Sequence, residues 1–188
     1  ELGAELTVLP LDILTDAAVT ANPPNRCYHC KKRIFSTILQ AASVDSFRVL
    51  ADGTNASDEA SGRPGMRALA ELSVRSPLRE CGLTKDEIRK LSRRAGLFTW
   101  NKPAYACLAT RIPSGEPITA ENLQKTEAAE RTLSAFGLAD FRVRLTGGAA
   151  KIQVRAEQLP LLLSQREAII NALKPYYQAV LLDLEVRG

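Results

Sequence analysis

The order of apolar patterns in the first fifty residues constrains the fold more than any other feature of the chain. Two short apolar runs, at 6–11 and 47–51, are predicted to be buried strands bounded by polar turns. Between them, residues 30–42 repeat apolar side chains at helical spacing. A strand–helix–strand order is typical of a parallel sheet covered by helices. The sequence therefore predicts an α/β domain, which we assign to residues 1–115.

A capping box predicts the best-defined helix of this domain. Thr84 has the side chain of an N-cap residue, and Glu87 stands three positions later, where it can bond back to the cap. The apolar residues that follow share one helical face, and Gly96 is placed to end the helix. We expect this helix to present the loop at 99–111 that follows it.

The pattern changes after a stretch rich in Pro and Gly at 111–117. Thr119 is placed to cap a helix that runs to about Phe136, and alternating apolar residues on both sides of 147–148 predict a β-hairpin. A further helix is expected over 160–173 and a last strand over 182–186. Residues 118–188 are therefore predicted to form a small C-terminal α+β domain.

Composition and charge restrict the class of protein. Of the 188 residues, 45% are apolar and 24% charged, which is sufficient for a folded core, and the apolar runs are far too short to span a membrane. The net charge of +4 suits an anionic ligand such as a nucleotide. Only 5% of residues are aromatic, which argues against nucleic acid as a partner. With four cysteines that do not form a disulfide framework, we expect a cytoplasmic protein with no membrane partner.

A polar loop follows the second predicted strand, where α/β proteins bind phosphates. Gly53 permits close approach of a ligand to the backbone, and Thr54 adds a hydroxyl group. Asp52 and Asp58 supply the carboxylates that Mg²⁺ uses beside phosphate oxygens. The loop is equally compatible with an Asx-rich turn that caps the next helix.

A lone cysteine, Cys107, lies in the segment TWNKPAYACLATR at 99–111, between Lys102 and Arg111. Nearby positive charge favours the reactive thiolate. The only histidine is His29, so the sequence gives little support to a Cys–His catalytic pair. A cysteine without a base is a structural residue, a metal ligand, or a sulfur source that attacks an already activated electrophile.

The other three cysteines do not predict a metal site by spacing alone. Cys27 and Cys30 enclose His29 in a C-x-x-C pair, but no second pair exists to complete four ligands. Burial at a helix start explains the pair equally well. Cys81 and Cys107 could complete a metal or cluster site only if the fold brings them close to Cys27 and Cys30.

The predicted hairpin is strongly basic on one face. Its cationic side chains at alternating positions are Arg142, Arg144, Lys151 and Arg155. Such a face can bind phosphate. It can equally be neutralised by cross-strand partners at Asp183 and Glu185, and Glu130 on the preceding helix can pair with an arginine.

Five segments in order resemble one known family. They are NPPNRCYHCK (22–31), VLADGTNASDEASGRPG (49–65), VRSPL (74–78), the long run ending in ACLATRIPSG (82–115) and FRVRL (141–145). Together they resemble the ATP-dependent sacrificial sulfur transferase (LarE) family of the PP-loop ATP pyrophosphatase superfamily. The resemblance extends over nearly the whole chain.

The resemblance implies a doubly wound parallel sheet of the adenine nucleotide alpha hydrolase type, followed by a small domain used in assembly and catalysis. It also implies an enzyme that uses ATP and Mg²⁺ to adenylate a pyridinium carboxylate mononucleotide, on the way to the nickel-pincer nucleotide cofactor. The family's sacrificial cysteine corresponds to Cys107, which would give up its sulfur and become dehydroalanine. The implied partners are this small-molecule nucleotide and further copies of the chain, in a homo-oligomer.

Further site residues follow from the resemblance alone. Arg111 would support the loop that carries Cys107. Arg142 and Arg144 would bind the substrate phosphate, with Glu130 close by. The nucleotide side would be lined by Asp52, Gly53, Thr54 and Asp58.

The chain departs from the family at its start, where the first strand and the SGGxDS phosphate loop are missing. We therefore expect that the sequence is a piece of a longer protein. Two alternatives remain open at this point. One is a different PP-loop enzyme, such as a tRNA thiolase or an amide-forming synthetase, and the other is a non-catalytic zinc or nucleic-acid binding module built on CYHC.

Overall fold

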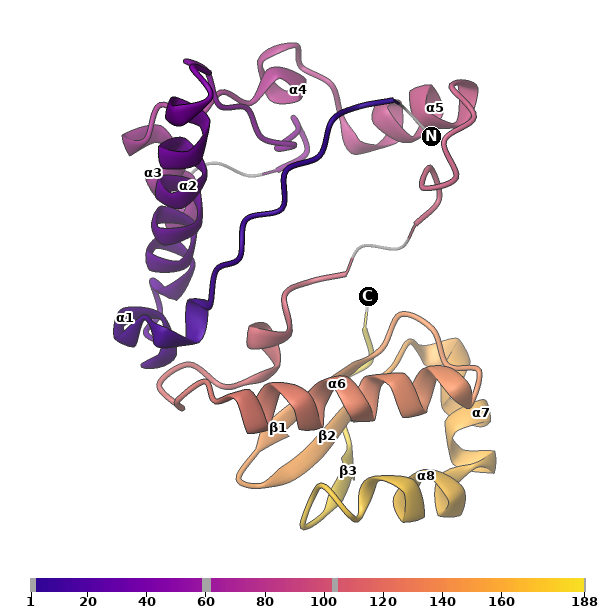
Figure 1. Cartoon of the computed structure of the whole chain (residues 1–188). Helices are drawn as coiled ribbons and strands as arrows, with labels where there is room; N and C mark the ends of the chain where they lie inside the picture. Colours follow the sequence, from indigo (N-terminus) through magenta and orange to yellow (C-terminus); the bar gives the residue numbers. More distant parts are fainter. Residues whose placement is uncertain (1–2, 59–61, 103–104, 188) are drawn as a thin grey trace. The chain divides into compact units, whose positions relative to one another are not determined.

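The computed structural model describes residues 3–58, 62–102 and 105–187, and it divides into two compact units (Figure 1). The first unit comprises residues 1–19 and 23–102, and the second comprises 20–22 and 103–188. Residues 20–22 join the second unit because the buried side chain of Asn22 donates to the backbone of its loop. Asn22 Nδ2 lies 2.7 Å from the carbonyl oxygen of Pro113 and 3.0 Å from that of Glu116.

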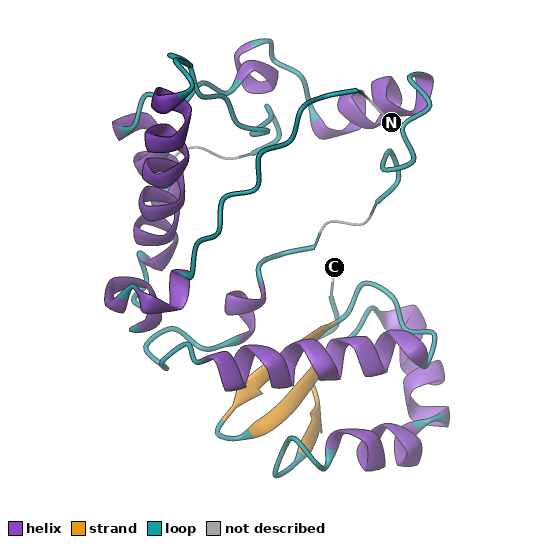
Figure 2. Cartoon of the chain, viewed as in Figure 1, coloured by secondary structure: helices purple, strands orange, loops and turns teal. Residues whose placement is uncertain are grey.

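Helices and loops make up the described part of the first unit (Figure 2). Its elements are η1 (Ile13–Thr15), α1 (Ala17–Thr20, which ends in the second unit), α2 (Arg26–Val44), α3 (Pro64–Glu71), α4 (Pro77–Glu80) and α5 (Lys85–Arg94). Helix α2 packs against α3. Gly65 permits a close approach there, since a Cβ at this position would lie 3.0 Å from Cδ of Lys31.

The capping box is confirmed at the start of α5. Thr84 Oγ1 accepts a hydrogen bond from the backbone N–H of Glu87, and the Glu87 carboxylate accepts one from the backbone N–H of Thr84. The helix ends at Arg94, and Gly96 follows with a φ of +70°, which a glycine adopts without strain.

The doubly wound parallel sheet is a wrong prediction for the described residues. The segments 6–11 and 47–51 are loops, except for one parallel bridge between Ala51 and Arg75 (Figure 2). Leu6 is 85% exposed and Phe47 is 68% exposed. A strand needs neighbours that pair its backbone along its length, and among the described residues the single bridge at Ala51 is the only such pairing in these segments.

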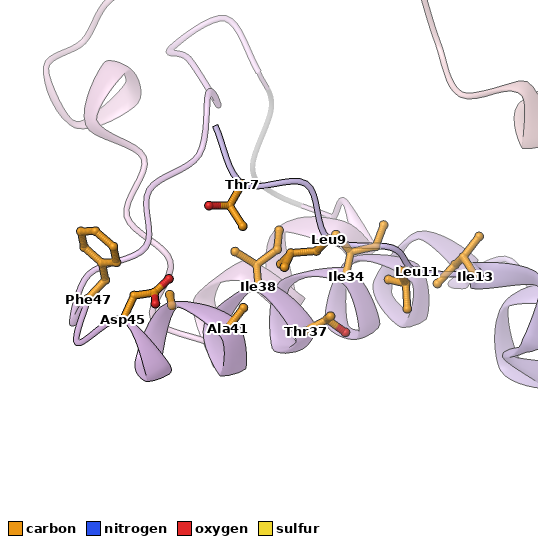
Figure 3. Close-up of a pocket in the computed structure, with 11 residues that line it drawn as sticks. Thr7, Leu9, Leu11, Ile13, Ile34, Thr37, Ile38, Ala41, Asp45 and Phe47 are labelled. Carbon is orange, nitrogen blue, oxygen red and sulfur yellow. The ribbon is translucent and has the colours of Figure 1, made fainter. Parts of the chain in front are cut away.

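The apolar face predicted for the first long helix is confirmed. Ile34 and Ile38 of α2 line an apolar pocket of about 580 Å³ together with Leu9 and Leu11 from the preceding loop (Figure 3). The sequence predicted that this face of α2 packs against a parallel sheet, but in the structure the loop with Leu9 and Leu11 lies against part of it.

The second unit is a three-stranded sheet with helices. Its elements are η2 (Leu108–Arg111), α6 (Ala120–Ala135), β1 (Arg142–Thr146), β2 (Ala149–Gln153), η3 (Ala156–Gln158), α7 (Leu159–Ser164), α8 (Arg166–Leu173) and β3 (Val180–Leu182). Strands β1 and β2 form the predicted antiparallel hairpin, with Val143 opposite Ile152, and β3 pairs parallel to β2. The fold is thus mixed α/β, with its sheet in this unit.

The core of this unit lies between α6, α8 and the sheet. Leu133, Val143, Ile152 and Leu173 are at most 2% exposed and belong to one apolar cluster. Thr119 caps α6 as predicted, with Oγ1 accepting from the backbone N–H of Asn122.

Two element boundaries differ from the sequence prediction. The expected helix over 160–173 is divided into α7 and α8 at Gln165, and the last strand is Val180–Leu182, earlier than 182–186.

Throughout residues 3–58, 62–102 and 105–187, no helix has the length and apolar character that crossing a membrane requires.

Candidate functional site

A pocket of about 570 Å³ in the first unit contains the nucleotide-binding candidates. All four of them, Asp52, Gly53, Thr54 and Asp58, line this pocket. The other lining residues come from α2, from α3 and from the residue before it; they are Cys27, Lys31, Phe35, Arg63, Pro64, Gly65 and Met66. The structure therefore places the loop that carries these four residues against helices α2 and α3, which the sequence did not indicate. We call this cavity the Asp52 pocket.

The parallel bridge fixes the backbone of Asp52. Its N–H donates to the carbonyl oxygen of Arg75 at 2.8 Å, and the N–H of Arg75 donates to the carbonyl oxygen of Leu50 at 2.8 Å. Asp52 thus directly follows the one paired position of this apolar run, although no full strand forms.

Two hydroxyl groups hold the carboxylate of Asp52. Thr54 Oγ1 donates to Oδ2 at 2.5 Å, and Ser76 Oγ donates to Oδ1 at 2.7 Å. Burial acts to raise the pKa of Asp52, but the hydrogen bonds from Thr54 and Ser76 outweigh it, and the pKa lies below its ordinary value. Asp52 is therefore ionised near neutral pH. Ser76 was not identified from the sequence, because it lies 24 residues away and carries no motif of its own.

The second carboxylate, Asp58, is held by the loop itself. Its Oδ2 accepts from the backbone N–H of Asn55 at 3.1 Å, and its Oδ1 lies 3.6 Å from Nη1 of Arg63. Asn55 forms an Asx turn to the N–H of Ser57, and Ser57 Oγ accepts from the N–H of Lys85 at the start of α5. The Asx turn is thus confirmed, but the loop does not cap the next helix, because α3 has Arg63 as its N-cap residue with no side-chain cap.

The donor set fits Mg²⁺ in chemical type. Both carboxylates face one pocket, and each retains lone pairs beyond the hydrogen bonds given above. Mg²⁺ commonly uses one or two carboxylates and takes its remaining ligands from phosphate and water. No group of three or more His, Cys, Asp or Glu side chains with metal-binding placement occurs in the described parts of the chain.

In the second unit, Cys107 combines a fixed backbone with an exposed side chain. It is the N-cap residue of η2, and its carbonyl oxygen accepts from the N–H and from Oγ1 of Thr110, at 2.9 and 2.7 Å. The sulfur is therefore presented to solvent from an ordered turn.

Arg111 anchors this turn from inside the unit. The guanidinium is 1% exposed and forms a two-point ion pair with Glu130 of α6, with Nε to Oε1 at 2.7 Å and Nη2 to Oε2 at 3.2 Å. Its Nη1 donates to Thr110 Oγ1 at 2.8 Å. The contact chain Glu130–Arg111–Thr110–Cys107 connects the helix to the cysteine.

Glu130 has two further donors. Tyr105 Oη donates to Oε2 at 2.8 Å, and the N–H of Val143 in β1 donates to Oε1 at 3.2 Å. The pKa of Tyr105 is raised, first by desolvation of the Tyr105 hydroxyl and then by its hydrogen bond to Glu130, although the Tyr105 side chain is largely exposed. Tyr105 is a member of the site that the sequence patterns did not single out.

The basic hairpin residues divide into two groups. Lys151 pairs with Asp183 at 2.9 Å, as the neutralised interpretation expects, and Arg155 pairs with Asp140 at 3.3 Å, a partner that the sequence did not indicate. Arg144 instead donates to the carbonyl oxygen of Thr110 at 3.1 Å, which places it at the Cys107 turn.

Arg142 is 8% exposed, and its Nη1 donates to the carbonyl oxygen of Phe141 at 2.7 Å. Desolvation, followed by the charges of Arg111 and Arg187, lowers its pKa. A buried guanidinium among other cations is a favourable place for an anion.

The remaining cysteines lie in the first unit. Cys27 and Cys30 fall in the first turns of α2, and Cys27 is exposed and lines the Asp52 pocket. Cys81 is exposed at the end of α4. Cys107 belongs to the second unit together with Arg111, Glu130, Arg142 and Arg144, whereas the nucleotide candidates belong to the first.

Comparison with known proteins relates the chain to two uncharacterized proteins and to a mononucleotide synthase. No protein-family model matches the chain. The chain is 41% identical over 140 residues to an uncharacterized protein of Synechocystis, covering 74% of this chain and 52% of that protein. It is 34% identical over 154 residues to pyridinium-3,5-bisthiocarboxylic acid mononucleotide synthase of Lactiplantibacillus plantarum, covering 82% of this chain and 56% of the synthase.

The chain thus spans about half the length of these two relatives. A third relative, an uncharacterized protein of Methanocaldococcus jannaschii, is 30% identical over 186 residues, covering 98% of this chain and 73% of that protein. The chain therefore belongs to the same family as this archaeal protein, and over most of its length it is similar to a pyridinium-3,5-bisthiocarboxylic acid mononucleotide synthase.

Proposed function

We propose that the protein is an ATP-dependent sulfur transferase that adenylates a pyridinium carboxylate mononucleotide and then inserts sulfur from its own Cys107. The observation that carries the proposal is the exposed thiol of Cys107 on a turn whose backbone is fixed by Thr110 and Arg111. Similarity to the synthase of Lactiplantibacillus plantarum supports the substrate class. Because the chain matches about half of that protein, the complete activity is part of the proposal.

The first step activates the substrate carboxylate. A carboxylate oxygen attacks the α-phosphorus of ATP, the bond to the β-phosphate oxygen breaks, and diphosphate leaves. In the Asp52 pocket, Gly53 and Thr54 would lie against the nucleotide. Asp52 and Asp58 would hold Mg²⁺, which supplies neutralisation of phosphate charge. The lowered pKa of Asp52 keeps its carboxylate ionised for this role.

The second step transfers the sulfur. The Cys107 thiolate attacks the carbonyl carbon of the acyl-adenylate and displaces AMP, which forms a thioester. Loss of the α-proton of Cys107 and cleavage of its Cβ–S bond then leave a thiocarboxylate on the product and dehydroalanine in the chain. Activation by adenylation provides the driving force, so the reaction requires a nucleophilic thiolate more than a catalytic base.

The surrounding residues would position these groups. Arg111 and Glu130 act through Thr110 on the backbone of Cys107, and we therefore assign them as positioning residues. Arg142 and Arg144 would bind the phosphate of the mononucleotide, because guanidinium groups match phosphate in charge and geometry. A homo-oligomer remains a prediction of the resemblance, which light scattering tests, and a cytoplasmic location remains a prediction from the cysteine pattern.

Intact mass measurement with peptide mapping tests the proposal directly. The protein is incubated with ATP, Mg²⁺ and the carboxylated pyridinium mononucleotide. We expect the peptide that contains Cys107 to lose one equivalent of H₂S, and Cys107→Ser to abolish the change. Cys81→Ser serves as the matched control, because Cys81 is also exposed but lies in the other unit. Diphosphate release with an unaltered Cys107 would contradict the sacrificial step while leaving adenylation intact.

A further inference from the structure

We propose that a second pocket of the first unit, lined by three arginines, binds a phosphate group. Its volume is about 570 Å³. Its charged lining residues are Arg63, Arg67 and Arg79, and none of the described residues that line it is acidic. We call it the arginine pocket. Its wall is completed by Asn25 and Tyr28 of the α2 region and by residues of α3.

Arg67 is held in place by an aromatic ring. Its guanidinium carbon lies 4.0 Å from the ring centroid of Tyr28, which is itself 9% exposed and donates to Glu71 at 2.7 Å. Arg67 Nε also pairs with Glu71 at 3.3 Å. A stacked, paired guanidinium loses less side-chain freedom when it binds an anion. Arg67 is therefore preorganised.

The other two arginines are held by the loop that carries Asp58. Arg79 Nη1 donates to the carbonyl oxygen of Asp58 at 3.0 Å, and Arg63 Nη1 lies 3.6 Å from its Oδ1. A guanidinium has five N–H donors, so these contacts leave donors available on each side chain. The side chains of Arg63 and Arg67 are 57% and 65% exposed, so a ligand can reach them.

Positive charge exceeds negative charge around the pocket. Two carboxylates, Asp58 and Glu71, contact its arginines. Three cationic side chains contact these carboxylates, namely Arg63, Arg67 and Lys32, and Arg79 adds a fourth cation through its bond to the backbone of Asp58. Planar guanidinium groups bind phosphate oxygens in a bidentate manner. The arrangement therefore selects a phosphate-bearing anion over a neutral ligand.

The arginine pocket is distinct from the Asp52 pocket, although they adjoin. Arg63, Pro64 and Met66 line both cavities. Asp52 and Thr54 line only the Asp52 pocket, and Arg67 and Arg79 line only the arginine pocket. The phosphate is thus either a free ion or part of a nucleotide that extends across Arg63. The proposal does not depend on the chemistry of Cys107, which lies in the other unit.

Titration of the whole chain with inorganic phosphate, and separately with AMP, tests the proposal. Binding is followed at low salt by NMR of the arginine Nε–H groups. We expect saturable shifts at Arg67, and Arg67→Gln should weaken binding by about tenfold or more, because one charge-assisted hydrogen bond is worth at least this factor. Arg93→Gln is the matched control, since Arg93 is also stacked on an aromatic ring, Trp100, but lines neither pocket.

The two ligands separate the two sources of phosphate. Binding of both ligands that weakens in Arg67→Gln supports a site for the free ion, and binding of AMP alone that weakens in this variant supports a nucleotide-borne phosphate. Equal binding by wild type, Arg67→Gln and Arg93→Gln overturns the proposal, as does the absence of saturable binding for both ligands. The measured group, Arg67, lines only the arginine pocket, so failure of this site is distinguishable from failure of the Asp52 pocket.

Discussion

Arg111 and Glu130 form a two-point ion pair in the interior of the second unit, with side-chain exposures of 1% and 6%. The pair joins the turn that carries Cys107 to helix α6. The backbone N–H of Val143 donates to the same carboxylate, so strand β1 is joined to this turn as well. A buried charge whose partner is removed keeps its full desolvation cost. The pair therefore makes the order of the Cys107 turn depend on the integrity of α6 and β1.

Glu130→Gln should destabilise the second unit by about 3–5 kcal/mol, since it leaves the Arg111 guanidinium buried without a carboxylate. Hydrogen exchange of the β1 amides reports the free energy of opening for this unit. Glu127→Gln is the control on the same helix, because Glu127 is exposed and forms a weak surface ion pair, with Oε1 3.8 Å from Nη2 of Arg131. It should change stability by less than about 1 kcal/mol. Similar effects of the two substitutions would contradict a structural role for the buried pair.

Thr84→Ala should destabilise α5 by about 1 kcal/mol, because it removes the side-chain acceptor of the capping box. Hydrogen exchange in the first turn of α5 measures the change. Lys90→Ala, at an exposed position of the same helix, is the control and should have little effect. An unaltered exchange rate in Thr84→Ala would mean that packing, not the cap, determines where the helix begins.

Local signals in the sequence predict local structure well. The capping box at Thr84 and the hairpin that turns at 147–148 depend on contacts between near neighbours, and both are present. The ion pair between Arg111 and Glu130 joins residues 19 positions apart. Family resemblance pointed to both residues, but no local pattern indicates that they contact each other. Tyr105 and Ser76 were missed for the same reason.

The parallel sheet was predicted wrongly because apolar character alone does not make a strand. Residues 47–51 have the composition of a buried strand, yet only Ala51 has a paired partner, at Arg75. Phe47 and Val49 remain 68% and 69% exposed. Sheet formation depends on neighbouring strands, which a short segment cannot specify by itself.

Ser76→Ala should raise the pKa of Asp52, because it removes one of the hydrogen bonds that stabilise the carboxylate. The folded pKa of Asp52 lies below its unfolded value of about 3.9, so its contribution to stability is complete above that pH. The contribution is lost as pH falls through the folded pKa. The variant should therefore be less stable than wild type above about pH 4, with a difference that shrinks at lower pH.

Carboxyl ¹³C NMR titration gives the pKa of Asp52 in each variant. Ser36→Ala is the matched control, at an exposed position of α2 that does not line the Asp52 pocket. An unshifted Asp52 in Ser76→Ala would show that Thr54 alone holds the carboxylate ionised.

ATP with Mg²⁺ should protect Cys27 from alkylation, because Cys27 is exposed and lines the same pocket as Asp52 and Thr54. For one site, the labelling rate falls in proportion to the fraction of protein that remains unbound, so ATP at ten times its Kd slows the reaction about tenfold. N-ethylmaleimide labelling followed by peptide mapping measures each cysteine separately.

Cys81 is the internal control in the same unit, since it is also exposed but lies outside the pocket. Its rate should stay constant while that of Cys27 falls, and Asp52→Asn should remove the protection by weakening Mg²⁺-nucleotide binding. Equal rates at Cys27 with and without ATP would place the nucleotide elsewhere. Equal slowing of Cys27 and Cys81 would instead indicate that ATP stabilises the whole unit, because local opening and not pocket occupancy would then limit both reactions.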